Sequence, residues 1–380
     1  MQRAEQLSVR DQIFTYIDTR TTATVDDIYR QPVDEYISSS IASREHEQLF
    51  RSRPLCVGLS GLIPHPGSFA THDLSGLPII LTRGDDGRAR AFLNVCRHRG
   101  ARVAEACGTT RAFTCPYHAW SYNLDGRLVG RPDDAAFGGA PRHEHGLVPL
   151  ATLEQDGLLW VLPRPETPFD GSAHMHGLNQ ELAAYDFGAM HHYASRTLHR
   201  RMNWKLLLDT FLESYHFCVL HKHSICSIFY DNLGTFDAYG PHFRLVSPRR
   251  TIESMREVAA PDVNLLPYIV ALYVLFPNTV LVWQLDHVEL WQIFPGPNAP
   301  DDGLVQLSLY TPAPATTSAA RQHWDKNLEL VLHVVENEDF PLGEGIQRGF
   351  HTGAQDFITF GRNEPGLTHF HRTLSAALQR

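Results

Sequence analysis

The sequence predicts an α+β protein in which a small all-β domain is inserted before a larger helix-grip domain, an antiparallel sheet followed by a long C-terminal helix. Three observations lead to this prediction. The chain has 380 residues, enough for two domains with separate cores. Residues 55–162 contain short β-rich runs divided by turns such as Asp125-Gly126. Residues 265–310 alternate in the manner of strands, and residues 317–335 follow a helical period.

These changes of pattern set the expected boundaries. Residues 1–49 are expected to form an N-terminal helical segment that packs with the larger domain. Residues 50–165 are expected to form the all-β domain, and the Pro-rich stretch that begins at Pro163 marks a linker. Residues 166–380 are expected to form the larger domain.

The elements of the larger domain follow in order. Trp204–Leu220 has the apolar spacing of a single helix. Leu265–Phe276 and Thr279–Phe294 are expected to be antiparallel strands joined at Pro277-Asn278, and Leu304–Tyr310 is expected to be the next strand. A long amphipathic helix then closes the domain.

Composition argues against several classes of protein. Lys and Arg total 33 and Asp and Glu total 42, a formal charge of −9, so we expect no nucleic-acid partner. The sequence has no run of about 18 apolar residues and no secretion signal, so we expect no membrane partner and a cytoplasmic location. The six Cys are then expected to be thiols rather than disulfides. The 22 His raise the prospect of a metal without locating it.

Two motifs in the all-β region each pair one Cys with one His. Cys96-Arg97-His98 is followed, after sixteen intervening residues, by Cys115-Pro116-Tyr117-His118. A Cys2His2 zinc site is one interpretation, but zinc fingers group Cys with Cys and His with His. Alternating Cys and His match a Rieske [2Fe-2S] cluster, in which two Cys bind one iron and two His bind the other. The spacing therefore favours a cluster bound by Cys96, His98, Cys115 and His118.

The residues around these pairs resemble the Rieske domain of Rieske non-haem iron oxygenases. The matching stretches are Cys-Arg-His-Arg-Gly and Cys-Pro-Tyr-His-Ala-Trp, and Ala119-Trp120 stand where the family has Gly or Ala followed by Trp. The resemblance extends from about residue 45 to residue 375. It implies a terminal oxygenase (alpha) subunit of the aromatic-ring-hydroxylating oxygenase family.

A second constellation lies in the predicted helix Trp204–Leu220 and just beyond it. Glu213, His216 and His221 form an E-x2-H-x4-H run. On a straight helix the two His would point about 140° apart, so the helix should end or bulge between them if both bind one ion. The alternative interpretation is a core His and a helix-end His without a metal. His223 is a rival for His221.

This run, with Asn203-Trp204-Lys205 before it, is similar to the mononuclear iron motif of the same family. The resemblance implies that His216 and His221 bind Fe(II) together with a distant carboxylate and leave positions open for dioxygen. We expect Asp339 to be this third ligand. Glu338, its neighbour, is the alternative.

The resemblance also implies partners. Glu213 matches the carboxylate that links a Rieske His ligand of one subunit to the iron-bound His of its neighbour, so a head-to-tail homotrimer or a multiple of it is expected. The sequence has no G-x-G-x-x-G fingerprint, so NAD(P)H is expected to act only through a separate reductase, with or without a ferredoxin. The alternative function is a Rieske electron-transfer protein without oxygenase activity.

O2 and a small organic molecule, aromatic or apolar, are the expected substrates. Monohydroxylation, dihydroxylation and oxidative dealkylation use the same iron ligands, and the sequence does not separate them. Lys222, Arg244 and Asp286 are candidates for contact with a polar substituent. The candidates for the pocket wall are Leu207, Phe211, Val219, Phe229 and Trp283.

Overall fold

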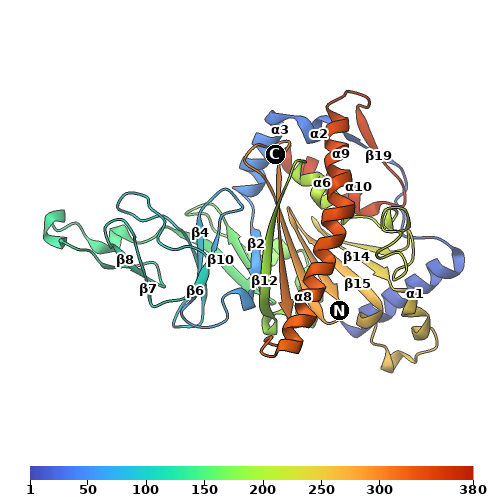
Figure 1. Cartoon of the computed structure of the whole chain (residues 1–380), viewed down its shortest axis with the longest axis horizontal. Coiled ribbons are helices and arrows are strands. Elements are labelled where there is room, and N and C mark those ends of the chain that lie inside the picture. The colour runs from blue at the N-terminus through green and yellow to red at the C-terminus, as the bar shows by residue number, and fades with distance from the viewer. Residues whose placement is uncertain (380) are drawn as a thin grey trace. The chain divides into compact units, whose positions relative to one another are not determined.

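The computed structural model describes residues 1–379, so Arg380, the end of the last predicted region, lies outside it. The chain divides into two units, which are coloured along the sequence in Figure 1. The small unit comprises Phe50–Gly171 and Phe187–His191. The large unit comprises Met1–Leu49, Ser172–Asp186 and the chain from His192 onward. The segment between the two sheets therefore crosses from one unit to the other more than once.

Antiparallel strands build the small unit. The bounds are β2 Leu55–Leu59, β3 Ser68–His72, β4 Ile79–Arg83, β5 Ala89–Leu93, β6 Cys107–Thr109, β7 Ala112–Thr114, β8 Ser121–Asn123, β9 Leu128–Gly130, β10 Pro149–Gln155 and β11 Leu158–Leu162. Seven strands form one sheet in the order β2-β11-β10-β5-β4-β3-β6, and β7-β8-β9 form another. Gly126 lies in the turn between β8 and β9 with φ +78°, and an added Cβ would lie 2.5 Å from the Phe92 ring. The predicted turn therefore requires glycine.

A second seven-stranded sheet is the centre of the large unit. Its order is β12-β18-β17-β16-β15-β14-β13, and successive pairs from β13 to β18 are antiparallel. Every residue of β17 except the last is buried, so this strand lies in the middle of the core. The strand bounds are β12 His191–Arg200, β13 Thr235–Tyr239, β14 His242–Pro248, β15 Ile269–Leu275, β16 Thr279–Gln284, β17 His287–Pro295 and β18 Gly303–Thr311, with a separate pair β1 Tyr29–Pro32 and β19 Phe357–Phe360.

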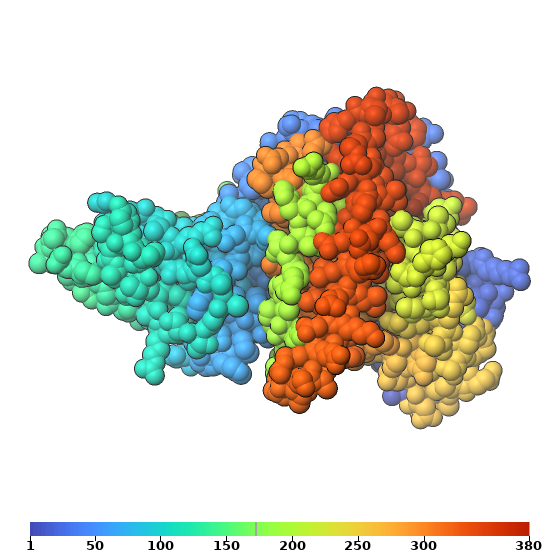
Figure 2. Space-filling model, viewed as in Figure 1, coloured from blue at the N-terminus to red at the C-terminus, as the bar shows by residue number. Residues whose placement is uncertain are grey.

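Helices cover this sheet, and α8 (Ser318–Val334) runs across one of its faces (Figure 1). The bounds are α1 Arg3–Thr19, α2 Asp34–Ile37, α3 Ser39–Glu45, α4 Gly171–Met175, α5 Leu178–Leu182, α6 Trp204–Asp209, α7 Phe217–Leu220, α8 Ser318–Val334, α9 Phe340–Phe350 and α10 Pro365–Leu378. Helix α8 buries Trp324, Leu328 and Val334 and turns its other side to solvent, where Figure 2 shows it as a surface ridge. This is the predicted α+β class, with the long helix following the sheet.

Two predicted elements are wrong in detail. Thr279–Phe294 is not one strand, because β16 and β17 form a hairpin in which Gln284 pairs with His287 across Leu285-Asp286. Leu285 has φ 52°, the left-handed backbone of a tight turn. The apolar pattern continues through the hairpin, so periodicity alone did not reveal the turn.

The predicted helix Trp204–Leu220 is likewise divided into α6 and α7. Between them the Glu213 side chain accepts the backbone N–H groups of Tyr215 and His216. Side chains that bond to nearby backbone groups in this way compete with helical hydrogen bonds. The interruption therefore lies just before His216.

Within residues 1–379, none of the helices combines the length and the apolar composition that crossing a lipid bilayer demands.

Candidate metal centres and substrate cavity

The two Cys/His motifs form similar loops at one end of the small unit. Cys96 N–H donates to Ala101 and its carbonyl accepts from Gly100, at 2.8 and 2.9 Å. Cys115 N–H donates to Trp120 and its carbonyl accepts from Ala119, at 2.9 and 3.0 Å. Each loop therefore turns tightly around its Cys, as two loops that close on one group must do.

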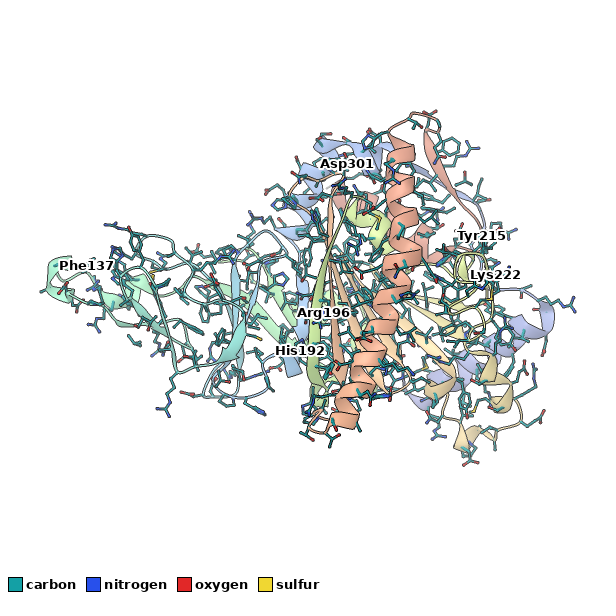
Figure 3. The ribbon with its side chains drawn as sticks, in the orientation of Figure 1. Phe137, His192, Arg196, Tyr215, Lys222 and Asp301 are labelled. Atoms are coloured by element: carbon teal, nitrogen blue, oxygen red, sulfur yellow. A yellow bond between two sulfur atoms is a disulfide. The ribbon has the colours of Figure 1, made fainter. Side chains whose placement is uncertain are left out.

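The ligand candidates of these loops face each other. Cys96 and Cys115 are buried free thiols, 2% and 3% exposed. The rings of His98 and His118 lie 4.6 Å apart between centroids, and His98 stacks on Trp120 at 4.9 Å. Phe137 packs edge-on against His98 and lies at the same end of the unit as β7 and β8 (Figures 1 and 3).

The donor atoms of these four residues fit a [2Fe-2S] cluster. Nδ1 of His98 and Nδ1 of His118 are both buried without a hydrogen-bond partner, a costly arrangement unless a metal binds there. The ligand atoms of a mononuclear zinc site lie close together around one ion. Among the described residues, the donor atoms of these four side chains do not form a group within 4.8 Å of one another, so they do not match such a site. Burial, followed by His118 and Arg99, lowers the pKa of His98, which favours the neutral imidazole that binds iron.

A different set of side chains converges in the large unit. His216, His221 and Asp339 each offer one ligand atom, and these atoms all lie within 4.8 Å of one another. Asp339 Oδ1 lies 3.6 Å from His216 Nε2 and 3.3 Å from His221 Nε2. Two imidazoles and one carboxylate with a free side are the ligand set of a non-haem Fe(II) site. The described residues contain no other such group of three.

The backbone explains how these ligands meet. His216 and His221 are the residues just before and just after the four-residue helix α7. The angle between their side chains is therefore not fixed at the value of a long straight helix. Asp339 ends a π-helical turn, Val335–Asp339, that joins α8 to α9. An extra residue in a helical turn reorients the side chains around it, and such turns are frequent at functional sites.

Carboxylates hold the outer nitrogen of each imidazole. Glu213 contacts Nδ1 of His216, and Glu338 contacts Nδ1 of His221. Ser224 Oγ donates to the same Glu338 oxygen at 2.7 Å. Burial alone would lower the pKa of His221, but Asp339 and Glu338 raise it. With a metal bound, Nδ1–H of His221 would donate to Glu338, and Nε2, which lies 3.3 Å from Asp339 Oδ1, would be the ligand atom.

The Asn203-Trp204-Lys205 stretch anchors the helix that leads to this site. Asn203 Oδ1 accepts the N–H of Lys205 at 3.0 Å and so caps α6. Trp204 Nε1 donates to Glu45 Oε2 at 2.8 Å, and Lys205 Nζ contacts the other Glu45 oxygen. Lys205 and Glu45 are 0% and 1% exposed, so this is a fully buried ion pair.

The expectation of six thiols is wrong. Cys218 and Cys226 form a disulfide with an S–S distance of 2.00 Å, and the other four Cys are free. The bond closes the loop that contains His221. The two Cys are eight positions apart, and only the turn after α7 brings them within bonding distance.

A cavity of about 170 Å³ reaches the triad. Its wall contains Phe211 and Phe229, as expected, but Leu207, Val219 and Trp283 are not part of it. Leu207 is wholly buried, and an added Cβ on Gly303 would lie 2.5 Å from its side chain. Val219 is 83% exposed on α7. Trp283 alternates with Val282 and Gln284, which do line the cavity, so it points to the other face of the sheet.

The polar candidates also lie elsewhere. Lys222 is exposed on the loop after α7 (Figure 3). Arg244 is buried among Glu5, Glu181 and Asp237. Burial would lower the pKa of Arg244, but Tyr273, Asp237, Tyr239 and Glu5 raise it. Asp286 is in the β16–β17 turn and contacts His287. Glu289 lines the cavity but was not among the residues predicted from the sequence; the one sign of it there is a single acidic residue within the apolar strand β17.

A pair of Cys/His loops, a two-His-one-carboxylate triad and a helix-grip sheet together define the class of Rieske non-haem iron oxygenases. The family model "Rieske [2Fe-2S] domain" matches residues 53–152, and the model "Ring hydroxylating alpha subunit (catalytic domain)" matches residues 187–380. The chain therefore belongs to the ring-hydroxylating alpha subunits, and the resemblance seen in the sequence is confirmed. The cofactors of this family are a [2Fe-2S] cluster and a mononuclear iron.

The relatives that the chain matches are named for different substrates. The chain is 34% identical over 192 residues to the glycine betaine monooxygenase oxygenase subunit of Chromohalobacter salexigens, covering 49% of this chain and 41% of that protein. It is 31% identical over 209 residues to the large oxygenase component of salicylate 5-hydroxylase from Ralstonia sp., covering 50% and 49%. The chain thus spans about half the length of the curated relatives it matches.

Solved structures share the fold over nearly the whole chain. The quaternary ammonium Rieske monooxygenase CntA superposes with a TM-score of 0.80 at 22% identity, covering 93% of this chain and 96% of that one. Naphthalene 1,2-dioxygenase from Rhodococcus sp. superposes with a TM-score of 0.73 at 16% identity, covering 98% and 97%. At these identities the similarity concerns the fold.

Proposed function

We propose that the protein is a terminal oxygenase that uses O2 and electrons from a separate reductase to oxidise a small organic substrate. The observation that carries this proposal is the His216–His221–Asp339 triad at the wall of a largely apolar cavity. A Rieske protein that only transfers electrons has no need of a second ligand set beside a cavity. The reaction is hydroxylation, single or double, or oxidative dealkylation, and the substrate has an aromatic or apolar body.

In this proposal each ligand set has one task. Cys96, His98, Cys115 and His118 would hold the cluster. His216, His221 and Asp339 would hold Fe(II) at the cavity wall. When bound, the cluster supplies electrons one at a time and the Fe(II) binds and activates O2. The apolar side chains of the cavity, such as Phe211 and Phe229, exclude water and position the substrate.

Glu213 is proposed to link the two centres between subunits. Its carboxylate contacts Nδ1 of His216, and its other oxygen accepts backbone N–H groups, so it is held in place on the iron side. The family resemblance assigns the second contact to a Rieske His ligand of the neighbouring subunit, which requires a head-to-tail homotrimer or a multiple of it. A reductase, with or without a ferredoxin, completes the proposed system.

Metal content and oxygen uptake test the proposal. The purified protein should contain the two irons and two labile sulfides of the cluster and one further iron per chain. Organic compounds should stimulate O2 consumption with a surrogate reductase. Asp339→Ala should abolish this consumption and leave the Rieske absorption and EPR signals unchanged. A preparation with only two irons and no stimulated O2 uptake would instead support the electron-transfer alternative.

A further inference from the structure

The described titratable groups that line the cavity are three carboxylates and the two imidazoles of the metal triad. Among the described residues that line it are the carboxylates of Glu213, Asp339 and Glu289 and the imidazoles of His216 and His221, and there is no Lys or Arg. Glu213 and Asp339 belong to the iron site. Glu289 is the remaining charged side chain, and the metal centre does not use it.

Glu289 is buried beside one imidazole and one indole N–H group. It is 5% exposed, and its Oε2 accepts from Trp291 Nε1 at 3.0 Å. Its other oxygen lies 3.7 Å from His287 Nε2. Burial would lower the pKa of His287, but Glu289 and Asp286 raise it. Asp286 is 53% exposed and also lies 3.5 Å from His323 Nε2, so Glu289 and His287 are the buried pair of this group.

Arg249, whose pKa is lowered by burial and raised by Glu289, makes its contacts with other groups. Arg249 donates to Gln284 Oε1 at 2.8 Å and lies 4.9 Å from the centre of the Phe229 ring. No ion pair within 4.0 Å joins Arg249 to Glu289 in the part of the chain that the structure describes. Glu289 therefore has one imidazole, 3.7 Å away, as its close basic neighbour, and a ligand that brings a positive charge would add a second electrostatic partner in the cavity.

Aromatic rings line the same cavity, and Trp291 contacts Glu289 directly. Trp291 and Phe211 both line the cavity, with ring centroids 5.0 Å apart at 53°, and Phe229 is a third aromatic wall residue. The rest of the wall is mainly aliphatic, including Leu245, and does not suit a hydrated metal ion. Aromatic faces beside a carboxylate are the combination that binds organic ammonium groups.

We propose that Glu289 and Trp291 form a cation subsite that binds a positively charged nitrogen of the substrate, either a quaternary ammonium or a protonated amine. This inference rests on the proposed function for the statement that the ligand is a substrate. The cation enters the acidic, aromatic part of the wall, while its apolar portion contacts the aliphatic side chains. An anionic aromatic compound would meet carboxylates without a compensating Lys or Arg.

Binding of charged and neutral probes of the same shape tests the subsite. Choline and 3,3-dimethylbutan-1-ol differ in one atom and in charge, and benzoate provides the anion. Calorimetric titration of the holoprotein under anaerobic conditions should show choline binding at least about tenfold more tightly than the alcohol, a difference of about 1.4 kcal/mol. Benzoate should not bind more tightly than the alcohol.

Glu289→Gln keeps the acceptor for Trp291 and removes the charge, so it should reduce the preference for choline to within about threefold. Glu257→Gln makes the same change at an exposed position outside the cavity wall and should leave the preference intact. An unchanged Rieske spectrum and melting temperature will show that Glu289→Gln is folded. Equal binding of choline and the alcohol, tighter binding of benzoate, no choline binding, or an undiminished preference in Glu289→Gln would overturn the inference.

The two proposals fail separately. If choline binds in a Glu289-dependent manner and no compound stimulates O2 uptake, the cation subsite stands and the oxygenase proposal fails. If neutral or anionic aromatic compounds stimulate O2 uptake and cations have no advantage, the oxygenase proposal stands and the subsite fails.

Discussion

Removal of the Glu338 carboxylate is expected to loosen the mononuclear iron without displacing a ligand. Glu338 contacts Nδ1 of His221 and accepts from Ser224 Oγ at 2.7 Å, so Glu338→Ala would leave the His221 ring free to rotate and to exchange its tautomer. The side chain is 21% exposed, and water can replace part of the lost interaction. Asp339 would keep its own position on the other side of the ring.

The magnitude follows from the role of such outer carboxylates. Loss of a hydrogen-bond partner behind a metal-binding His lowers metal affinity by about 10- to 100-fold, or about 1.4 to 2.7 kcal/mol. Glu338→Gln retains an acceptor for Nδ1–H without the charge, so its effect should be smaller than that of Glu338→Ala. Asp339→Ala removes a ligand and should cause a larger loss than either.

Chelator competition measures this directly. The rate and extent of Fe(II) transfer to ferrozine from the holoprotein report on the mononuclear site, and the Rieske EPR signal of the same sample reports on the cluster. Glu336→Ala is the matched control, because Glu336 belongs to the same π-helical turn and pairs with Arg200 instead of a His. Wild-type iron retention in Glu338→Ala would refute the positioning role. Complete iron loss in Glu338→Ala, together with retention in Asp339→Ala, would make Glu338 the ligand.

Three further predictions concern the large unit. Glu45→Ala leaves the buried Lys205 ammonium unpaired and should lower the free energy of unfolding by about 3–5 kcal/mol, most of which Lys205→Met should restore in the double variant, as calorimetry can determine. Alkylation of denatured protein should modify four Cys before reduction and six after it, whereas six without reduction would contradict the Cys218–Cys226 disulfide. Burial lowers the pKa of His242 to about 4, so its contribution of at most about 3 kcal/mol is present above pH 6.5 and is lost as the pH falls toward 4. Denaturant unfolding should therefore show a weaker dependence on pH in His242→Gln over this range, and an equal dependence would count against the buried neutral imidazole.

The local patterns of the sequence were sufficient wherever the chemistry depends on residues close together in the chain. The two Cys/His pairs define the cluster loops because each pair occupies one turn, and the family models confirm the resemblance that they suggested. The spacing of His216 and His221 required an interruption of the helix. Its place could not be predicted, because it depends on hydrogen bonds from the Glu213 side chain to the backbone.

Choices between neighbouring residues needed the tertiary structure. The sequence left Glu338 and Asp339 as alternatives for the third ligand. In the structure Asp339 lies beside both Nε2 atoms and Glu338 lies at Nδ1 of His221. The π-helical turn determines which carboxylate faces which nitrogen, and a shift of one position in a helix rotates a side chain by about 100°.

By itself, the sequence determined the class of protein, the order of its domains and the residue types at its candidate metal centres, because these depend on short spacings and on strand and helix periods. Only the tertiary structure decided which side chains face the cavity. Leu207 and Trp283 are apolar and near the motif, yet they lie outside the wall, while Glu289 lies inside it. The face of a strand and the packing of a helix depend on contacts between distant segments, and periodicity does not encode these contacts.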